Sequence, residues 1–220
     1  MRVNTFTLAA IMTTTGSTFA VVVPFTETFS ADSAGWRDST STALNWFASG
    51  GDGGTAYVSG PFNFVNNLAN DTPVILRGQS NFNSSGGAIF GNWIADGVTS
   101  FSIAVRHNAG QPLNFFSRFA SPAAFPGAVA VNFAPVMPNT WTTLTFPIDP
   151  SNPQFISFEG SDFNTVFSNV GRVQVGVSVP ASMAGVDQSF AFDLDTVSLV
   201  PAPGALALLG VAGIFVRRRR

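Results

Sequence analysis

The stretch Arg172–Val179 reads RVQVGVSV, with a valine at every second position. Successive side chains of a β-strand point to opposite sides, so the valines share one face and the Arg, Gln, Gly and Ser residues share the other. The pattern therefore predicts a strand with one side on an apolar core and the other side toward solvent, which is typical of antiparallel sheets.

The same alternation recurs through the middle of the chain. It is clear in 101–106 and 128–133, and further strands are expected near 22–30, 43–48, 54–59, 73–77, 87–94, 113–119, 141–146 and 190–199. Clusters of Gly, Asn, Ser and Pro separate these segments and predict turns. Many short strands divided by turns indicate an all-β fold, an antiparallel β-sandwich. One helical turn is expected at 162–169, where Ser161 or Asp162 can cap.

The composition indicates a phenylalanine-rich core and a weakly charged surface. The chain has 23 Phe against 4 Trp and 1 Tyr, and Phe has no polar group to place at a wet surface. Charged residues make up only 10% of the chain, compared with roughly 25% in an average soluble protein. The chain has no cysteine, which excludes disulfides, thiolate metal sites and a cysteine nucleophile.

The distribution of charge disfavours a nucleic-acid partner. All ten basic residues are Arg, and five of them lie in the terminal segments. Five arginines therefore face twelve acidic residues in the central part, a net charge of −7. Binding of nucleic-acid phosphates needs a basic surface, which this balance does not predict.

The N-terminal segment 1–20 has the order of a secretory signal peptide. Arg2 is followed by the mostly apolar stretch Phe6–Met12 and by small residues that end at Ala20. We expect cleavage after Ala20 and export; the alternatives are a first strand or an unstructured start.

The C-terminal segment 200–220 has the features of a short membrane anchor. Gly204–Val216 is an unbroken apolar run, closed by four consecutive arginines. A helix of this length extends about 20 Å, shorter than the roughly 30 Å hydrocarbon core of a bilayer. We expect a short hydrophobic helix that anchors transiently in the inner membrane, with its arginines on the cytoplasmic side.

This tail resembles the PEP-CTERM sorting signal of Gram-negative bacteria, which combines a Pro-Glu-Pro-type motif, a short hydrophobic helix and a basic end. Alanine stands here where the type motif has glutamate. The resemblance implies processing by an exosortase-type enzyme and final placement at the cell surface or in the extracellular matrix. The matching residues are Val200, Pro201, Ala202, Pro203, Arg217, Arg218, Arg219 and Arg220.

The central segment 21–199 is similar to jelly-roll modules of the galactose-binding and carbohydrate-binding type. The similarity lies in an early strand at 27–29 followed by Gly35-Trp36, a strand at 141–146, a turn before Val173 and a last strand at 192–199. It implies a jelly-roll sandwich. Modules of this kind often hold a structural calcium ion between the first and last strands, which here would draw on Glu27 and on Asp193 or Asp195.

Calcium prefers oxygen ligands, so the three carboxylates suit it chemically. The alternative interpretation is that they bind no metal and are exposed to solvent or cap turns. No cofactor is required. Asp193 and Asp195 are also the acidic residues that lie closest together in the central segment. A third interpretation is therefore that they catalyse glycoside hydrolysis as two facing carboxylates. The single histidine, His107, is expected in an exposed loop, and no serine-type triad is recognisable. We therefore expect no enzymatic activity.

Sugar binding needs aromatic faces exposed to solvent together with polar groups that fix hydroxyls. The candidates are Trp46, Tyr57 and Trp93, which adjoin Gly- and Asn-rich loops; the alternative is that they pack in the core. The leading hypothesis is an exported, sorted β-sandwich protein with a structural or adhesive role. The second is a carbohydrate-binding module acting in the exopolysaccharide, and a hydrolase is the third.

Overall fold

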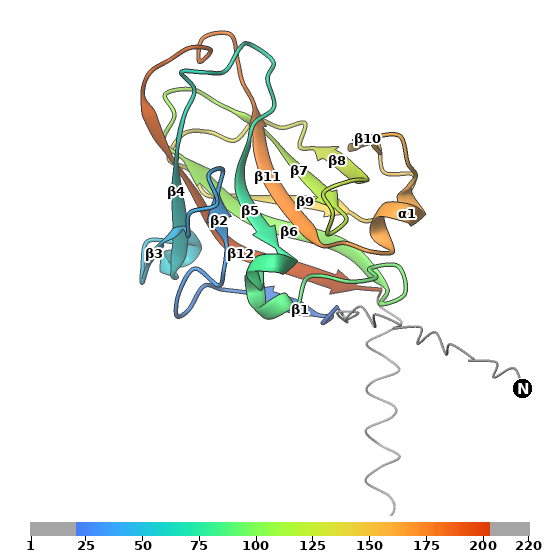
Figure 1. Cartoon of the computed structure of the whole chain (residues 1–220). Helices are drawn as coiled ribbons and strands as arrows, with labels where there is room; N and C mark the ends of the chain where they lie inside the picture. Colours follow the sequence, from blue (N-terminus) through green and yellow to red (C-terminus); the bar gives the residue numbers. More distant parts are fainter. Residues whose placement is uncertain (1–20, 203–220) are drawn as a thin grey trace, which may run out of the picture.

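The computed structural model describes residues 21–202, which form two antiparallel sheets packed face to face (Figure 1). The proposed signal peptide, 1–20, lies outside the described residues, as does the tail from Pro203 onward. Within the described part, no helix has the length and apolar character needed to cross a bilayer.

Sheet A is built around β12, the longest strand of the described part. Its order is β3-β4-β12-β6-β9, and the short β1 pairs with the second half of β12, beyond the stretch that β4 occupies. β12 extends through Val200 and Pro201, so the expected sorting motif begins inside the last strand of the sandwich. The strands are β1 (Phe25–Glu27), β3 (Asn45–Phe47), β4 (Tyr57–Asn63), β6 (Val98–His107), β9 (Thr142–Pro147) and β12 (Ser189–Pro201).

Sheet B contains the valine-rich strand that the sequence marks most clearly. Its order is β10-β8-β7-β11-β5-β2, and β11 pairs with β7 on one side and β5 on the other. In Figure 1 these strands lie in front of β12 and β6. The strands are β2 (Arg37–Asp38), β5 (Val74–Gln79), β7 (Asn114–Ala120), β8 (Gly127–Val131), β10 (Phe155–Ser157) and β11 (Arg172–Ser178).

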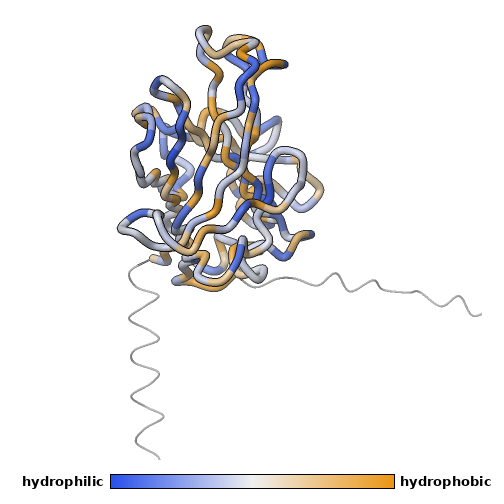
Figure 2. Tube along the Cα trace, turned by 90° about the vertical axis from the view of Figure 1, so that its left-hand side faces the viewer, coloured by the Kyte–Doolittle hydropathy of each residue, from blue (hydrophilic) through white to orange (hydrophobic). Residues whose placement is uncertain are grey.

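A layer of phenylalanine rings fills the space between the sheets. Phe119 is fully buried, and its ring centroid lies 5.3 Å from that of Trp93, 5.2 Å from that of Phe101 and 5.5 Å from that of Phe167. Hydrophobic and hydrophilic residues are mixed along the strands rather than gathered in blocks (Figure 2), as expected when one side of each strand faces the core. The expectation of a phenylalanine-rich core is confirmed.

The expected all-β sandwich is confirmed, and so is the helical turn. Helix α1 (Phe163–Phe167) begins after Asp162, whose carboxylate accepts a hydrogen bond from the Thr165 backbone N–H at 2.8 Å. This bond satisfies one of the free N–H groups at the helix start. The expected alternation at 113–119, 141–146 and 172–179 coincides with β7, β9 and β11.

The strand expected at 87–94 is wrong. This segment is a series of turns after the 3₁₀ helix η3 (Ser84–Gly87), with a positive φ at Gly87 and Gly91. Its apolar residues nevertheless reach the core, because Ile89, Phe90 and Trp93 are buried. The short strands β2 and β10 were not expected, since two or three residues are too few to show an alternation.

Candidate functional site

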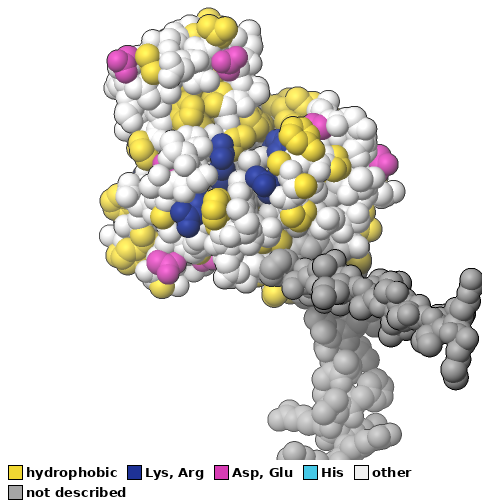
Figure 3. Space-filling view, viewed as in Figure 1, with side chains coloured by type: hydrophobic (Ala, Val, Ile, Leu, Met, Phe, Trp, Pro, Cys, Tyr) yellow, Lys and Arg dark blue, Asp and Glu magenta, His cyan; other side chains and the backbone are white. Residues whose placement is uncertain are grey.

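The outer face of sheet B is hollowed into a groove of about 500 Å³. The space-filling view in Figure 3 shows this hollow between two raised parts of the surface, with arginine side chains gathered in it. The groove crosses β5, β11, β7, β8 and β10. Residues lining its floor and rim include Val74, Asn114, Phe116, Arg118, Val129, Val131, Ile156, Ser157, Glu159 and Ser178.

The strand periodicity places these side chains. On β7, Phe115, Ser117 and Phe119 point to the core, so Asn114, Phe116 and Arg118 point outward. The ring of Phe116 lies over Gly176 of β11, where an added Cβ would come within 2.3 Å of the ring and of the Pro73 carbonyl oxygen. Glycine at 176 therefore leaves room for the Phe116 ring, which is only 5% exposed, so the apolar surface open to the groove comes mainly from Ile156, which is 62% exposed.

A network of hydrogen bonds around Arg118 supplies the polar part of the groove. The guanidinium donates through Nε to Glu159 Oε1 at 2.5 Å and through Nη2 to Glu159 Oε2 at 2.6 Å, which makes the ion pair bidentate. It also donates to Gln174 Oε1 at 2.7 Å and lies over the Phe125 ring at 5.1 Å. Bidentate pairs fix orientation as well as adding energy, so the polar groups are held in place.

Gly127 makes room for this network. A Cβ at position 127 would lie 2.8 Å from Arg118 Nη2 and 2.8 Å from Glu159 Oε2. At Gly127, strand β8 therefore approaches the ion pair closely enough to leave no space for a side chain. The groove thus combines an apolar floor, a fixed charged pair and a rim of amide and hydroxyl groups, a mixture that suits a polar ligand with apolar ring faces.

The outer face of sheet A carries a smaller cavity, of about 320 Å³, beside a packed aromatic cluster. Tyr57 stacks on Phe47 with ring centroids 4.9 Å apart and meets the edge of Trp141 at 5.7 Å. The guanidinium of Arg106 lies over both Tyr57 and Trp141 and pairs with Asp193 at 2.7 Å. Tyr57 is partly covered by its neighbours, whereas Phe47 keeps 43% of its surface exposed.

The three aromatic candidates are therefore not brought together. Tyr57 is half-buried in the cluster on sheet A, and Trp46 is 39% exposed, with its indole N–H donating to the Phe29 carbonyl at 2.6 Å. Trp93 is fully buried between the sheets, and its indole N–H donates to the Ile89 carbonyl at 3.0 Å. The expectation that Trp93 presents a ring to solvent is wrong, because the turns at 88–94 fold into the core.

Each of the carboxylates expected at a calcium site has other partners. Asp195 is buried and accepts bonds from the Asp52 backbone N–H at 2.8 Å and the Thr55 hydroxyl at 2.6 Å, which holds the turn before β4. Asp193 pairs with Arg106, and Glu27 accepts from the Phe29 N–H at 2.9 Å.

Within residues 21–202, no group of three or more acidic, His or Cys side chains converges as a metal site would require. Glu27, Asp193 and Asp195 therefore do not fit a shared calcium ion. Asp193 and Asp195 have separate partners, and of the two only Asp193 lines the cavity on sheet A.

His107 is not in an exposed loop, which corrects the sequence-based expectation. It ends β6 and is 1% exposed, with Nε2 3.0 Å from the Val136 carbonyl oxygen. Burial lowers the pKa of the imidazole below its usual value, and the bond to Val136 and the charge of Asp193 oppose that shift. The ring packs against Phe115 and Phe192, so His107 is a core residue.

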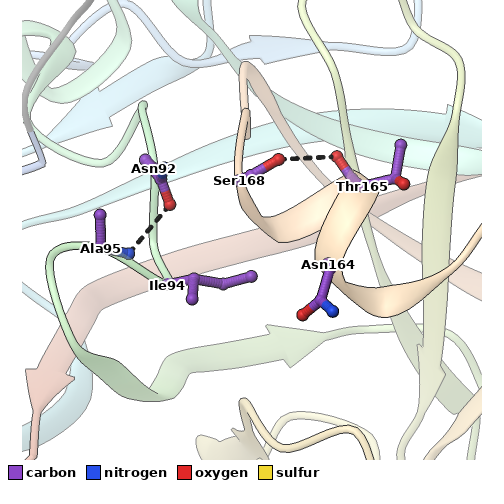
Figure 4. A pocket seen from close by; sticks show the side chains of 6 residues that line it. All are labelled: Asn92, Ile94, Ala95, Asn164, Thr165 and Ser168. Carbon is purple, nitrogen blue, oxygen red and sulfur yellow. Dashed lines mark hydrogen bonds between the residues drawn. The ribbon is translucent and has the colours of Figure 1, made fainter.

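A third cavity, of about 450 Å³, lies between the turns before β6 and helix α1 (Figure 4). Its polar groups serve local structure: Asn92 accepts from the Ala95 N–H at 2.9 Å, and the Ser168 hydroxyl donates to the Thr165 carbonyl at 3.2 Å. Among residues 21–202, no aromatic or charged side chain lines it. It is a weaker candidate than the groove on sheet B.

Solved structures similar to this chain include carbohydrate-binding modules, some of them joined to glycoside hydrolase modules. A Clostridium thermocellum chain that joins the first family 22 module of xylanase 10B to its GH10 module, determined with xylohexaose, matches with a TM-score of 0.50 and 14% identity. The match covers 82% of this chain and 29% of that one, so this chain spans less than a third of that two-module protein.

Two single modules from the same organism are similar over most of their length. The C-terminal family 22 module of that xylanase matches with a TM-score of 0.45 and 12% identity, over 81% of this chain and 94% of the module. The family 11 module of Lic26A-Cel5E matches with a TM-score of 0.40 and 11% identity, over 82% of this chain and 97% of the module. No family model and no curated protein matches the chain. At these identities the similarity concerns the fold, which is a jelly-roll β-sandwich.

The residues of the groove were not singled out by the sequence. Arg118, Glu159 and Phe116 carry no motif, and Glu159 lies 41 positions from Arg118. One signal was present: the polar positions of the stretch 172–179 form the outward side of the central strand of this face.

Proposed function

We propose that this protein is a non-catalytic carbohydrate-binding module and that the groove on sheet B holds the sugar chain. This is the second of the three functional hypotheses drawn from the sequence. The observation that carries it is the groove itself, in which the exposed Ile156 side chain and the bidentate Arg118–Glu159 pair line one open face.

The chemistry of a sugar fits this combination. A pyranose ring has an apolar face of C–H groups and a rim of hydroxyls, so it needs a flat apolar surface beside fixed hydrogen-bonding groups. The groove offers the exposed Ile156 and the half-buried Val131 for the first requirement. Asn114, Ser157 and Ser178 serve the second. It is open at the surface, which lets a polymer pass across the sheet. The similar structures support the proposal through the fold.

Retardation of the full chain in native gels that contain neutral polysaccharides tests the proposal. Xylan, mixed-linked β-glucan and agarose are suitable probes, with an unrelated protein as the mobility reference. We expect retardation by at least one of them and a loss of about tenfold in affinity for Asn114→Ala, because a polar contact to a ligand contributes about 1 kcal/mol or more.

Asn45→Ala is the matched control, since Asn45 is also exposed but lies on the outer face of sheet A. It should bind as the unaltered protein does. Tyr57→Ser tests the other face, and a loss of binding for this variant with none for Asn114→Ala would move the site to sheet A. The absence of retardation by every neutral and acidic polysaccharide would overturn the proposed function.

We also propose that the protein acts outside the cell, after export and sorting through its tail, with a structural or adhesive role in the matrix. The support is the order of charge, apolar run and cleavage site at 1–20 and the resemblance of 200–220 to a PEP-CTERM signal. The intact mass of the native protein tests this: loss of both ends supports processing by an exosortase-type enzyme, and a retained Arg217–Arg220 end contradicts it.

A further inference from the structure

A row of arginines crosses the outer face of sheet B and begins in the groove. The strand register places Arg118 opposite Gln174, Gln174 opposite Arg77, and Arg77 opposite Arg37. Directly opposed residues point to the same side of a sheet, and Arg172, two positions before Gln174, joins them. Four of the five arginines in residues 21–202 thus share one face, and Figure 3 shows basic side chains in dark blue gathered on this side of the molecule.

Arg118 differs from the other three because it has an acidic partner. Its guanidinium pairs with Glu159, whereas no carboxylate of the described residues lies within ion-pair distance of the rest of the row. The two ion pairs found within 21–202 are Arg118–Glu159 on this face and Arg106–Asp193 on the other. The arginines without an acidic partner are Arg37, Arg77 and Arg172.

The hydrogen bonds of these three arginines are few. Arg37 donates once, to the Ser41 carbonyl at 2.9 Å, and Arg172 donates once, to the Pro122 carbonyl at 3.0 Å. Arg77, in the middle, donates to no group in residues 21–202, and the Nε atoms of Arg37 and Arg77 are buried without a partner. A guanidinium has five N–H donors, so most of this donor capacity is unused by the described chain.

The arrangement opposes folding rather than supporting it. Arg37 and Arg77 are directly opposed on neighbouring strands, where like charges destabilise a sheet. Burial lowers the pKa of Arg77, and the charge of Arg172 lowers it further. Asp38 is the nearby carboxylate that opposes this shift, but its oxygen Oδ1 accepts bonds from the turn at 40–42. A group that is unfavourable for the fold and concentrated on one face points to a ligand.

We infer that the arginine row is an anion-binding extension of the groove and that the ligand is an acidic polysaccharide, one that carries carboxylate or sulfate-ester groups. This inference rests on the proposed function, because it specifies the class of sugar chain that the groove accepts. The planar guanidinium suits both anions, since its paired N–H groups match two oxygens of a carboxylate or a sulfate.

The size and charge of the row fit a polymer. From β7 to β2 the row crosses three strand spacings, about 14 Å, which is longer than one sugar ring. The described residues carry a net charge of −7, so this face is a local exception on an acidic domain. An acidic polymer is therefore repelled elsewhere and attracted here, which also orients it along the row.

Matched polysaccharides that differ in charge test the inference on the full chain. Polygalacturonate and its methyl ester share one backbone, and dextran sulfate and dextran share another. We expect binding to polygalacturonate at least tenfold tighter than to the methyl ester, with an affinity that falls as NaCl is raised. Comparison of polygalacturonate with dextran sulfate identifies which anion is preferred.

Variants of the row locate the binding. Arg77→Gln should lower the affinity for the acidic polymer about tenfold, since hydrogen bonds to charged groups contribute more than neutral ones. Arg77→Lys keeps the positive charge but loses the paired N–H donors of the guanidinium, so its affinity should fall less than that of Arg77→Gln. Thr145→Glu is the control: Thr145 is exposed on the outer face of sheet A, and the change alters the net charge by the same amount.

Three outcomes contradict the inference. Equal binding of polygalacturonate and its methyl ester, unaffected by Arg77→Gln, would be consistent with carbohydrate binding. It would show that the arginine row does not recognise anionic groups. Equal loss for Thr145→Glu and Arg77→Gln would assign the effect to net charge rather than to the row. Single-stranded DNA binding as tightly as the acidic polysaccharides would show a charge-driven surface with no preference for sugars.

Discussion

The two outer faces of the sandwich use arginine in opposite ways. On sheet A, Arg106 pairs with Asp193, donates to the Gly50 carbonyl at 3.1 Å and lies over the Trp141 ring at 4.5 Å. On sheet B, Arg77 has none of these contacts within the described residues and stands opposite Arg37. Both are basic residues on strands of an antiparallel sheet. The difference lies in whether the fold itself satisfies the side chain.

This difference separates structural residues from candidate binding residues. A charged group whose partners come from its own chain contributes to stability, and its removal leaves those partners unpaired. A charged group held in place without partners contributes little to stability and remains available to a ligand. The aromatic cluster of sheet A is tied to the fold through Arg106 and Asp193, although Phe47 stays 43% exposed. On sheet B the arginines, rather than the aromatic residues, distinguish the face.

The largest expected effect comes from removing the charge on each face. Arg106→Gln should lower the free energy of unfolding by about 2 kcal/mol, because Asp193 loses its partner in a largely buried position. Arg77→Gln should leave it within about 0.5 kcal/mol of the unaltered protein or raise it, because a repulsive pair is removed. Urea unfolding of both variants measures the contrast. Similar destabilisation by the two changes would mean that the row on sheet B is structural.

A smaller effect is expected from filling the space beside the Arg118–Glu159 pair. Gly127→Ala should destabilise the protein by about 1 kcal/mol and weaken polysaccharide binding, because the new methyl group lies 2.8 Å from both partners of the pair. Gly110→Ala is the control, since a Cβ there meets no atom within 4 Å. Thermal unfolding and gel retardation measure the two effects, and unchanged binding for Gly127→Ala would argue against a role for the pair.

The smallest effect concerns pH and separates stability from binding. The unfolded chain protonates His107 with a pKa of about 6.5, whereas burial lowers that pKa in the folded protein. The unfolded state therefore takes up the proton first, so stability is complete above about pH 6.5 and falls as the pH drops toward the folded pKa.

Melting temperatures at pH 7.5, 6.5 and 5.5 measure this dependence. We expect a decline for the unaltered protein and a flatter profile for His107→Gln. Binding by the arginine row should be unchanged over the same range, because the arginines stay protonated. An equally steep profile for both proteins would assign the decline to other groups.

The sequence by itself determined the class of fold. Alternation in stretches such as 172–179 marks the buried side of each strand, since the period of a strand is a local property of the backbone. The cap of the short helix at Asp162 was equally local and is confirmed. The same reasoning gave a wrong strand at 87–94, where turns bury the apolar residues. Turns have no regular spacing of side chains, so the sequence pattern does not identify them.

The site depended on contacts that only the tertiary structure decides. Arg37, Arg77 and Arg118 are far apart in the sequence, and the pairing of β2, β5, β11 and β7 brings them into one row. Whether a tryptophan is buried like Trp93 or partly exposed like Trp46 depends on how the loops close over the sheets. The sequence determines which side of a strand a residue occupies, whereas strand order and register decide which residues become neighbours, because these arise from long-range packing.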